Sequence, residues 1–142
     1  MKPDKAAICD LIPHASRMCL IDEVLSWDQD HIVCAVHLHN LQDSPLRNEH
    51  GLAAIHGVEY AAQALALQAA LSGGNSAAAD SGYLVAMKDI SWNTHCLDKV
   101  GAPLRIEVQV LLRSASAMIG AFEIKAADEA LMQGRLTVMN EA

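Results

Sequence analysis

The sequence has no run of about 18 uninterrupted apolar residues, so its hydrophobicity does not indicate a membrane-spanning helix. Basic residues are also scarce: 10 Lys and Arg stand against 17 Asp and Glu, and they form no cluster. Because phosphate binding requires grouped Lys and Arg side chains, nucleic acid is not an expected partner. The N-terminal segment carries charges together with Pro3 and Pro13, a pattern that a signal peptide does not have.

Metal-binding and redox motifs are missing as well. No C-x-x-C pair occurs among the four cysteines, which are Cys9, Cys19, Cys34 and Cys96. Because free cysteines are usually buried, we expect reduced thiols in the core and a cytoplasmic protein. His37 and His39 share a predicted strand but have no third ligand at a suitable spacing, so no metal site is predicted.

What the sequence does have is enough apolar material for one core. Its 142 residues are 52% hydrophobic and 19% charged, and we expect a single domain over residues 1–142. Periodicity and turn signals predict two helices and six strands. The predicted helices cover residues 6–12 and 57–71, and the predicted strands cover residues 18–27, 31–39, 83–93, 104–113, 117–126 and 130–139.

The second predicted helix is the most apolar segment of the chain. No charged residue occurs from position 60 to position 79, and a helix that is apolar on every side is a buried helix. Successive strands with short connections favour an antiparallel sheet. We therefore expect an α+β fold in which a curved antiparallel sheet wraps around one long central helix. In the strand 104–113, one face is expected to carry Leu104, Ile106, Val108, Val110 and Leu112.

Glu59 is the only charged residue between His56 and Asp80. An ionised carboxylate in an apolar environment costs several kcal/mol unless it is paired or neutralised. Burial would therefore favour the protonated form that a general acid needs. The alternative is that Glu59 is exposed in the first helical turn and complements the helix dipole. The residues alone leave both readings open.

His56, Glu59 and Gln63 stand at positions i, i+3 and i+7, which places them on one stripe of the predicted helix. Gly57 at the helix start would let a ligand approach the backbone amides there, and such amides can stabilise a developing oxyanion. A carboxylic acid, an imidazole and amide donors at one helix end suit chemistry beside a thioester carbonyl. The expected reaction is proton abstraction at the α carbon with loss of a β-hydroxyl.

Two segments resemble a known family. The stretch LIPHASRMCLIDEVLSWDQDHIVCAV, residues 11–36, resembles the opening pattern L-x-P-H-R-x-P-x-L-x-[LI]-D-x-V of the hotdog-fold 3-hydroxyacyl-acyl carrier protein dehydratases. The stretch EYAAQA, residues 59–64, resembles their central-helix motif E-A-M-A-Q. Within that family, the sequence is most similar to the dehydratase-like proteins of aryl polyene gene clusters.

The resemblance implies a hotdog fold and a homodimer with two active sites at the subunit interface, and a hotdog heterodimer is the alternative assembly. In the family, a His from the loop before the helix of one subunit faces a carboxylate on the helix of the other. That carboxylate corresponds to Glu59, and the glycine that polarises the thioester corresponds to Gly57. The family His belongs to an H-F-P segment that falls on Pro45 here, so His56 or His50 would have to act as base, and His56 is favoured by its position beside Gly57.

The implied reaction is dehydration of a 3-hydroxyacyl thioester on an acyl carrier protein to the trans-2-enoyl thioester, with no metal or organic cofactor. The acidic carrier would require a basic docking patch, for which the candidates are Arg47, Lys88, Lys99 and Arg105. Gln63 would help to bind the substrate. Two alternatives stay open. One is a hotdog thioesterase in which Glu59 activates water, and the other is a non-catalytic acyl-binding subunit of a dehydratase heterodimer.

Overall fold

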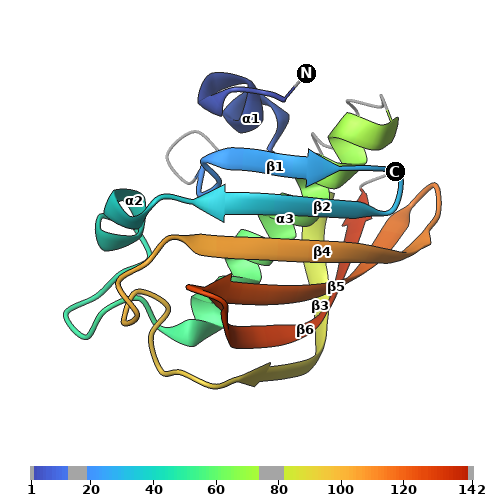
Figure 1. The fold of residues 1–142 in the computed structure, drawn as a ribbon. Coiled ribbons are helices and arrows are strands. Elements are labelled where there is room, and N and C mark those ends of the chain that lie inside the picture. Colours follow the sequence, from blue (N-terminus) through green and yellow to red (C-terminus); the bar gives the residue numbers. More distant parts are fainter. Residues whose placement is uncertain (1, 13–18, 74–81, 141–142) are drawn as a thin grey trace.

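The computed structural model describes residues 2–12, 19–73 and 82–140. They form a six-stranded sheet with one long helix lying against it (Figure 1). In chain order the elements are α1 (Lys5–Leu11), β1 (Glu23–Trp27), β2 (His31–Val36), α2 (Leu38–Gln42), the short 3-10 helix η1 (Ala54–His56), α3 (Gly57–Gly73), β3 (Gly82–Trp92), β4 (Leu104–Arg113), β5 (Ala117–Ala126) and β6 (Glu129–Asn140).

The sheet is antiparallel throughout, with the strand order β1-β2-β4-β5-β6-β3. The predicted α+β arrangement of a long helix and an antiparallel sheet is confirmed, and β4 and β5 begin and end at the predicted residues. β3 follows α3 in the chain but lies at the far edge of the sheet, where it pairs with β6. The two edges of the sheet are therefore β1 and β3.

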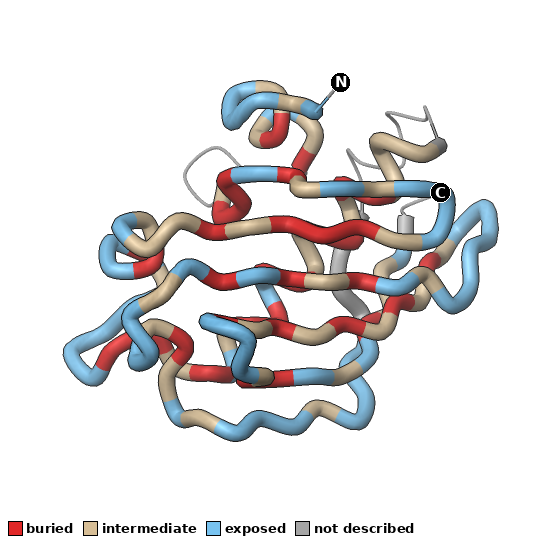
Figure 2. Tube along the Cα trace, viewed as in Figure 1, coloured by how far each residue is buried: buried red, intermediate tan, exposed pale blue. Residues whose placement is uncertain are grey.

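The core fills the space between α3 and the sheet. β5 alternates buried and half-buried residues along its whole length, which is the period of two that lets one face of a strand meet a helix. In Figure 2 the buried residues are concentrated in the middle of the sheet, whereas residues 86–92 of the β3 edge are mostly exposed. None of the helices in the described ranges has the length and apolar character that crossing a bilayer requires.

The expectation that α3 is covered on every side is only partly correct. One face carries the large buried side chains of Tyr60, Leu65 and Leu67. The opposite face is made of Glu59, which is exposed, and of alanines such as Ala62 and Ala66, which are half-buried. Within one protomer, the helix therefore leaves a strip of small side chains open to solvent.

The predicted strand 31–39 ends early, at Val36, and the chain turns into α2. The reason is a contact with a distant residue, because the buried carboxylate of Asp22 accepts the His37 N–H at 2.7 Å and the Asn40 side-chain amide at 2.7 Å. His37 and His39 consequently do not share a strand face. The His37 ring instead lies 2.9 Å from the Glu23 carboxylate.

The expectation of four reduced thiols is wrong for two of them. Cys9, in α1, and Cys19, ahead of β1, form a disulfide with their Cα atoms 5.5 Å apart. The sequence pattern placed Cys19 inside a strand, but β1 begins only at Glu23, so Cys19 lies in the segment that passes α1. Cys34 and Cys96 are free, and burial raises the pKa of the Cys34 thiol to about 12.

Candidate functional site

The start of α3 follows η1 without a break, and this junction carries most of the predicted site residues. η1 ends at His56, and α3 begins at Gly57 with Glu59 in its first turn. The His56 N–H closes the short helical turn by donating to Ala53 O at 3.0 Å. His56 and Glu59 are therefore held three residues apart on rigid backbone, and the His56 side chain is half-buried.

Glu59 is exposed, and within the described part of the chain its carboxylate has no hydrogen-bond or ion-pair partner. Of the two readings that the sequence left open, the exposed position in the first helical turn is the one observed. Such a position is favourable for a negative charge, because the helix dipole is positive at this end. Burial of Glu59 would require a second protein chain or a bound substrate.

Gly57 is explained by packing rather than by open space for a ligand. A Cβ at this position would overlap the sulfur of Met132 and would lie 2.9 Å from Ile124 Cδ1. The Gly57 N–H already donates to the carbonyls of Ala54 and Ile55. This amide is therefore bonded within its own chain, and Gly57 lets the start of α3 lie directly on β5 and β6. A role of Gly57 in polarising a thioester stays a prediction.

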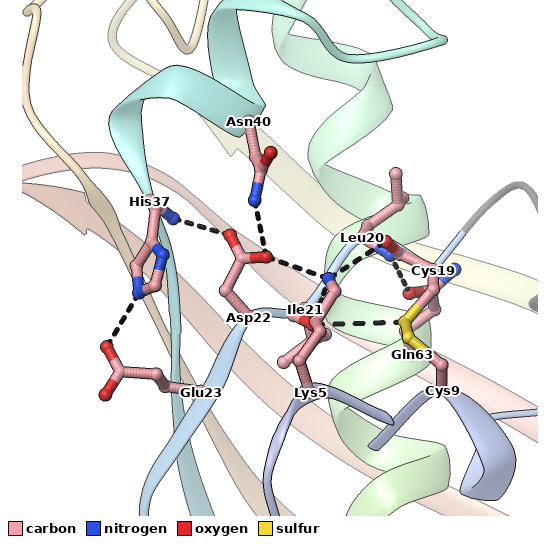
Figure 3. Close-up of polar contacts among 10 residues, drawn as sticks. All are labelled: Lys5, Cys9, Cys19, Leu20, Ile21, Asp22, Glu23, His37, Asn40 and Gln63. Carbon is pink, nitrogen blue, oxygen red and sulfur yellow. Dashed lines mark hydrogen bonds and ion pairs between the residues drawn. A yellow bond between two sulfur atoms is a disulfide. The ribbon is translucent and has the colours of Figure 1, made fainter. Parts of the chain in front are cut away.

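Gln63 faces the N-terminal segment of the chain. Its side-chain carbonyl accepts the Leu20 N–H at 2.8 Å, which links α3 to the residues ahead of β1 (Figure 3). Next to this link, Asp22 also forms an ion pair with Lys5, with Nζ and Oδ1 2.8 Å apart. Gln63 lies on the same helix face as Glu59, four residues on, and this bond gives it a structural contact; a role in substrate binding stays a prediction.

His50 lies in the loop between α2 and η1. Its side chain is 84% exposed and stands 3.6 Å from the Glu49 carboxylate. The His50 N–H donates to Asn48 Oδ1 at 2.8 Å, and its carbonyl accepts the thiol of Cys96 at 3.3 Å. The backbone of His50 is thus tied in place while its ring points into solvent.

Two polar contacts of buried side chains escaped the sequence pattern. Asp98 forms an ion pair with Arg47, and its carboxylate is almost buried at 8% exposed. Tyr60 is buried in α3, and its hydroxyl lies 2.9 Å from the Ser44 hydroxyl. Burial is the main reason that the pKa of Tyr60 is raised. Neither Asp98 nor Tyr60 has a local sequence signal, because their partners lie far away in the chain.

A cavity of about 170 Å³ lies beside Tyr60, next to the segment where the family His is expected. Its lining consists of Lys5, Cys19, Leu20, Asn40, Asp43, Pro45 and Tyr60. A larger hollow of about 350 Å³ lies at the charged residues Arg105, Glu107 and Lys125. These residues alternate with the buried ones of β4 and β5, so that hollow is on the outer face of the sheet, away from α3.

The four predicted carrier-docking residues lie on different elements. Lys88 is on the β3 edge, and Arg105 is on the outer face of β4. Arg47 and Lys99 belong to the two loops beside the start of α3, but Arg47 is engaged with Asp98. Within the described residues, no group of three or more His, Cys, Asp and Glu side chains is placed to hold a metal ion.

Comparisons with known proteins agree with this geometry. Residues 6–142 match the sequence model of a family described as ApeP-like, ApeP dehydratase. The solved structure of the dehydratase heterocomplex ApeI:P from Xenorhabdus doucetiae matches with a TM-score of 0.83 at 24% identity, over 95% of this chain and 91% of that chain. No curated protein sequence matches.

Other solved structures share the fold, a thioesterase among them. Thioesterase superfamily member 2 of zebra fish matches with a TM-score of 0.67 at 18% identity, over 96% of this chain and 95% of that one. The PaaI protein of the E. coli phenylacetic acid degradation operon matches with a TM-score of 0.59 at 14% identity, over 82% of this chain and 81% of that one. The six-stranded antiparallel sheet around α3 is thus the hotdog fold.

Proposed function

This chain belongs to the ApeP-like dehydratase family, and on that premise we propose that it dehydrates a 3-hydroxyacyl thioester carried on an acyl carrier protein. The observation that carries the proposal is Glu59, a carboxylate in the first turn of α3 without a partner in the described part of its own protomer. A carboxylate in this position is free to act on a substrate or to face a second subunit.

In the proposed reaction, His56 is the base and Glu59 is the acid. The imidazole takes the α proton, the thioester carbonyl receives the electron pair, and the C–O bond at the β carbon breaks as the double bond forms. Glu59 protonates the leaving hydroxyl, which departs as water. Positioned acid and base groups of this kind contribute about 10²- to 10⁴-fold each. His50 is the alternative base, if the partner subunit brings its loop against Glu59.

We propose that a second hotdog subunit completes the site. β3 is a sheet edge with a free side, and it carries Met87 and Trp92, whose exposed fractions are 50% and 45%. An open edge with exposed apolar side chains is a surface that proteins normally cover. Because ApeI:P of Xenorhabdus doucetiae is a dehydratase heterocomplex, a different hotdog subunit is the favoured partner, and a second copy of this chain is the alternative.

The decisive experiment supplies the 3-hydroxyacyl thioester on its carrier protein to the purified chain, alone and mixed with a hotdog partner, and follows the products by mass spectrometry. An unsaturated thioester that is still on its carrier supports dehydration. Free acid and free carrier thiol would instead identify a thioesterase, the activity suggested by the fold relatives and by the missing H-F-P histidine. If turnover needs the partner and survives Glu59→Gln, this chain is a non-catalytic subunit.

We propose a cytoplasmic location as well, together with an acidic carrier protein that docks beside the start of α3 through Lys99. The Cys9–Cys19 disulfide is the feature that tests this location, because reducing compartments disfavour disulfides. Alkylation of the thiols in intact cells, followed by mass spectrometry of the protein, would determine whether Cys9 and Cys19 are oxidised there. Two alkylated cysteines at positions 9 and 19 fit the cytoplasm, and an intact disulfide argues for an oxidising compartment.

A further inference from the structure

The loop that carries His50 and leads into η1 is bound along its length to the loop that precedes β4. Ala54 N–H donates to His95 O at 2.9 Å, and Leu97 N–H donates to Leu52 O at 2.8 Å. The two loops lie side by side at the end of the sheet where α3 begins (Figure 1). The direction in which the chain enters η1 is therefore set by residues more than forty positions further along the chain.

Asp98 holds this loop at two points with one carboxylate. Its Oδ1 accepts the Leu52 N–H at 3.1 Å, and its Oδ2 accepts the Arg47 Nε–H at 2.7 Å. Burial acts to raise the pKa of Asp98, but the hydrogen bonds from Arg47 and the Leu52 amide outweigh it, so the pKa is lowered. Asp98 thus makes both contacts as a carboxylate.

Gly51 shows how closely the loop follows Asp98. Its φ of +107° is one that side chains rarely adopt, and a Cβ there would lie 3.1 Å from Asp98 Oδ1 and 3.3 Å from Cys96 Sγ. A side chain at position 51 would therefore be strained by the positive φ and would push the carboxylate away by a few tenths of an ångström. Asp98 is consequently in contact with the loop on both sides of the Gly51 turn.

We infer that Asp98 is a positioning residue for the proposed site. By holding Arg47 and Leu52, its carboxylate fixes the path by which the chain enters η1, and thereby where the His56 ring stands in the assembled site. The inference rests on the proposed function, since it concerns the placement of the proposed base. Asp98 itself touches no reacting atom in this scheme.

Asp22 supplies a matched control elsewhere in the fold. It is a buried carboxylate that accepts a backbone N–H, from His37 at 2.7 Å, and pairs with a partly exposed cation, Lys5 at 2.8 Å. Its third donor is the Asn40 amide at 2.7 Å. Figure 3 shows these contacts of Asp22. Because all of its partners lie outside residues 47–56, Asp22 and Asp98 hold different segments of the chain in similar ways.

The test compares Asp98→Ala and Asp98→Asn with Asp22→Asn in the active assembly, well below the melting temperature of every variant. Asp98→Ala should lower kcat about 10-fold with little change in KM, because small displacements of a catalytic group mainly affect the chemical step. Asp98→Asn keeps an acceptor for the Leu52 amide and should retain most of the activity. Asp22→Asn should leave kcat unchanged even if its melting temperature falls further.

A measurement that does not depend on turnover tests the inference independently of the proposed function. Hydrogen exchange of the amides of residues 53–59 should accelerate in Asp98→Ala and not in Asp22→Asn. Unchanged exchange in Asp98→Ala, or an equal loss of kcat in Asp22→Asn, would overturn the positioning role. A wild-type assembly without dehydratase activity would refute the proposed function, and exchange would then still decide whether Asp98 positions the loop. If Asp98→Ala does not fold, Asp98→Ser replaces it in both measurements.

Discussion

The polar side chains at the two ends of α3 differ in burial and in hydrogen bonding. Near the C-terminal end, Gln68 is fully buried and satisfied: its amide donates to the carbonyls of Asp28 and Gln29, both at 2.9 Å, and its carbonyl accepts from Arg113 at 2.6 Å. At the N-terminal end, Glu59 is exposed and has no partner within the described residues.

Under the proposed function, this difference separates a structural polar group from a catalytic one on the same helix. A buried polar group that has every hydrogen bond made within its own chain holds two segments together, and its removal is costly. Glu59 holds no second segment within the described residues, and its structural contribution there is limited to the favourable helix dipole. The comparison therefore predicts that changes at Gln68 reduce stability and that changes at Glu59 reduce activity.

The largest expected effect is on His56. His56→Ala removes the proposed base and should abolish dehydration in a steady-state assay, a loss of about 10²-fold or more. His50→Ala is the matched control, since its ring is 84% exposed, and it should mainly change the apparent affinity for the carrier-bound substrate. A dead His50 variant beside an active His56 variant would transfer the role of base to His50.

Glu59→Gln should come next, with a loss of about 10²-fold in turnover, because a carboxamide cannot protonate the leaving hydroxyl. The exposed position of Glu59 predicts an unchanged melting temperature. Differential scanning calorimetry alongside the kinetic assay tests both halves. Near-normal turnover in this variant would show that Glu59, like Gln68, is not required for catalysis.

Gln68→Leu should show the opposite pattern. Losing the amide removes the Gln68 donor from the Asp28 carbonyl and one of the two bonds of the Gln29 carbonyl and of Arg113, which still bond each other at 3.0 Å. This loss should lower the free energy of unfolding by about 2 kcal/mol. Urea denaturation measures this loss, and Gln42→Leu at an exposed position is the control. Turnover at low temperature should persist in this variant. A stable but inactive Gln68→Leu protein would contradict the prediction that Gln68 contributes to stability and not to activity.

The smallest effect concerns pH. The folded pKa of Asp98 is lowered from its usual 3.8, so Asp98 contributes stability that is present above the unfolded-state pKa and is lost as the pH falls through the folded-state pKa. Asp98→Asn should therefore be less stable than wild type near neutrality and should show a shallower loss of stability below about pH 4. If wild type and Asp98→Asn lose stability equally as the pH falls, Asp98 does not make this pH-dependent contribution.

Local periodicity was sufficient to predict most of the fold. The alternation of Leu104, Ile106 and Val108 places one face of β4 in the core, and all three are buried. The prediction is wrong at Leu112, which is 54% exposed. A register shift between Val110 and Leu112 interrupts the alternation, and a bulge of this kind is decided by pairing with β5 rather than by β4 itself.

The site was predictable only where its residues are neighbours in sequence. The spacing of His56 and Glu59 was enough to place them together at the start of α3. The packing of Gly57 against Met132 and the ion pair between Arg47 and Asp98 join residues about fifty or more positions apart. No periodicity encodes such contacts, and whether Glu59 is exposed depends on which side of α3 the sheet covers.

The Cys9–Cys19 link changes what a cut in the backbone would do. A protease that cleaves anywhere between these two positions produces two pieces that still run as one species until a reductant is added. α1 would then remain attached while the chain is nicked, and its Lys5 would stay within reach of Asp22. Limited digestion followed by gels with and without reductant would thus report the redox state of the protein directly from the sizes of its fragments.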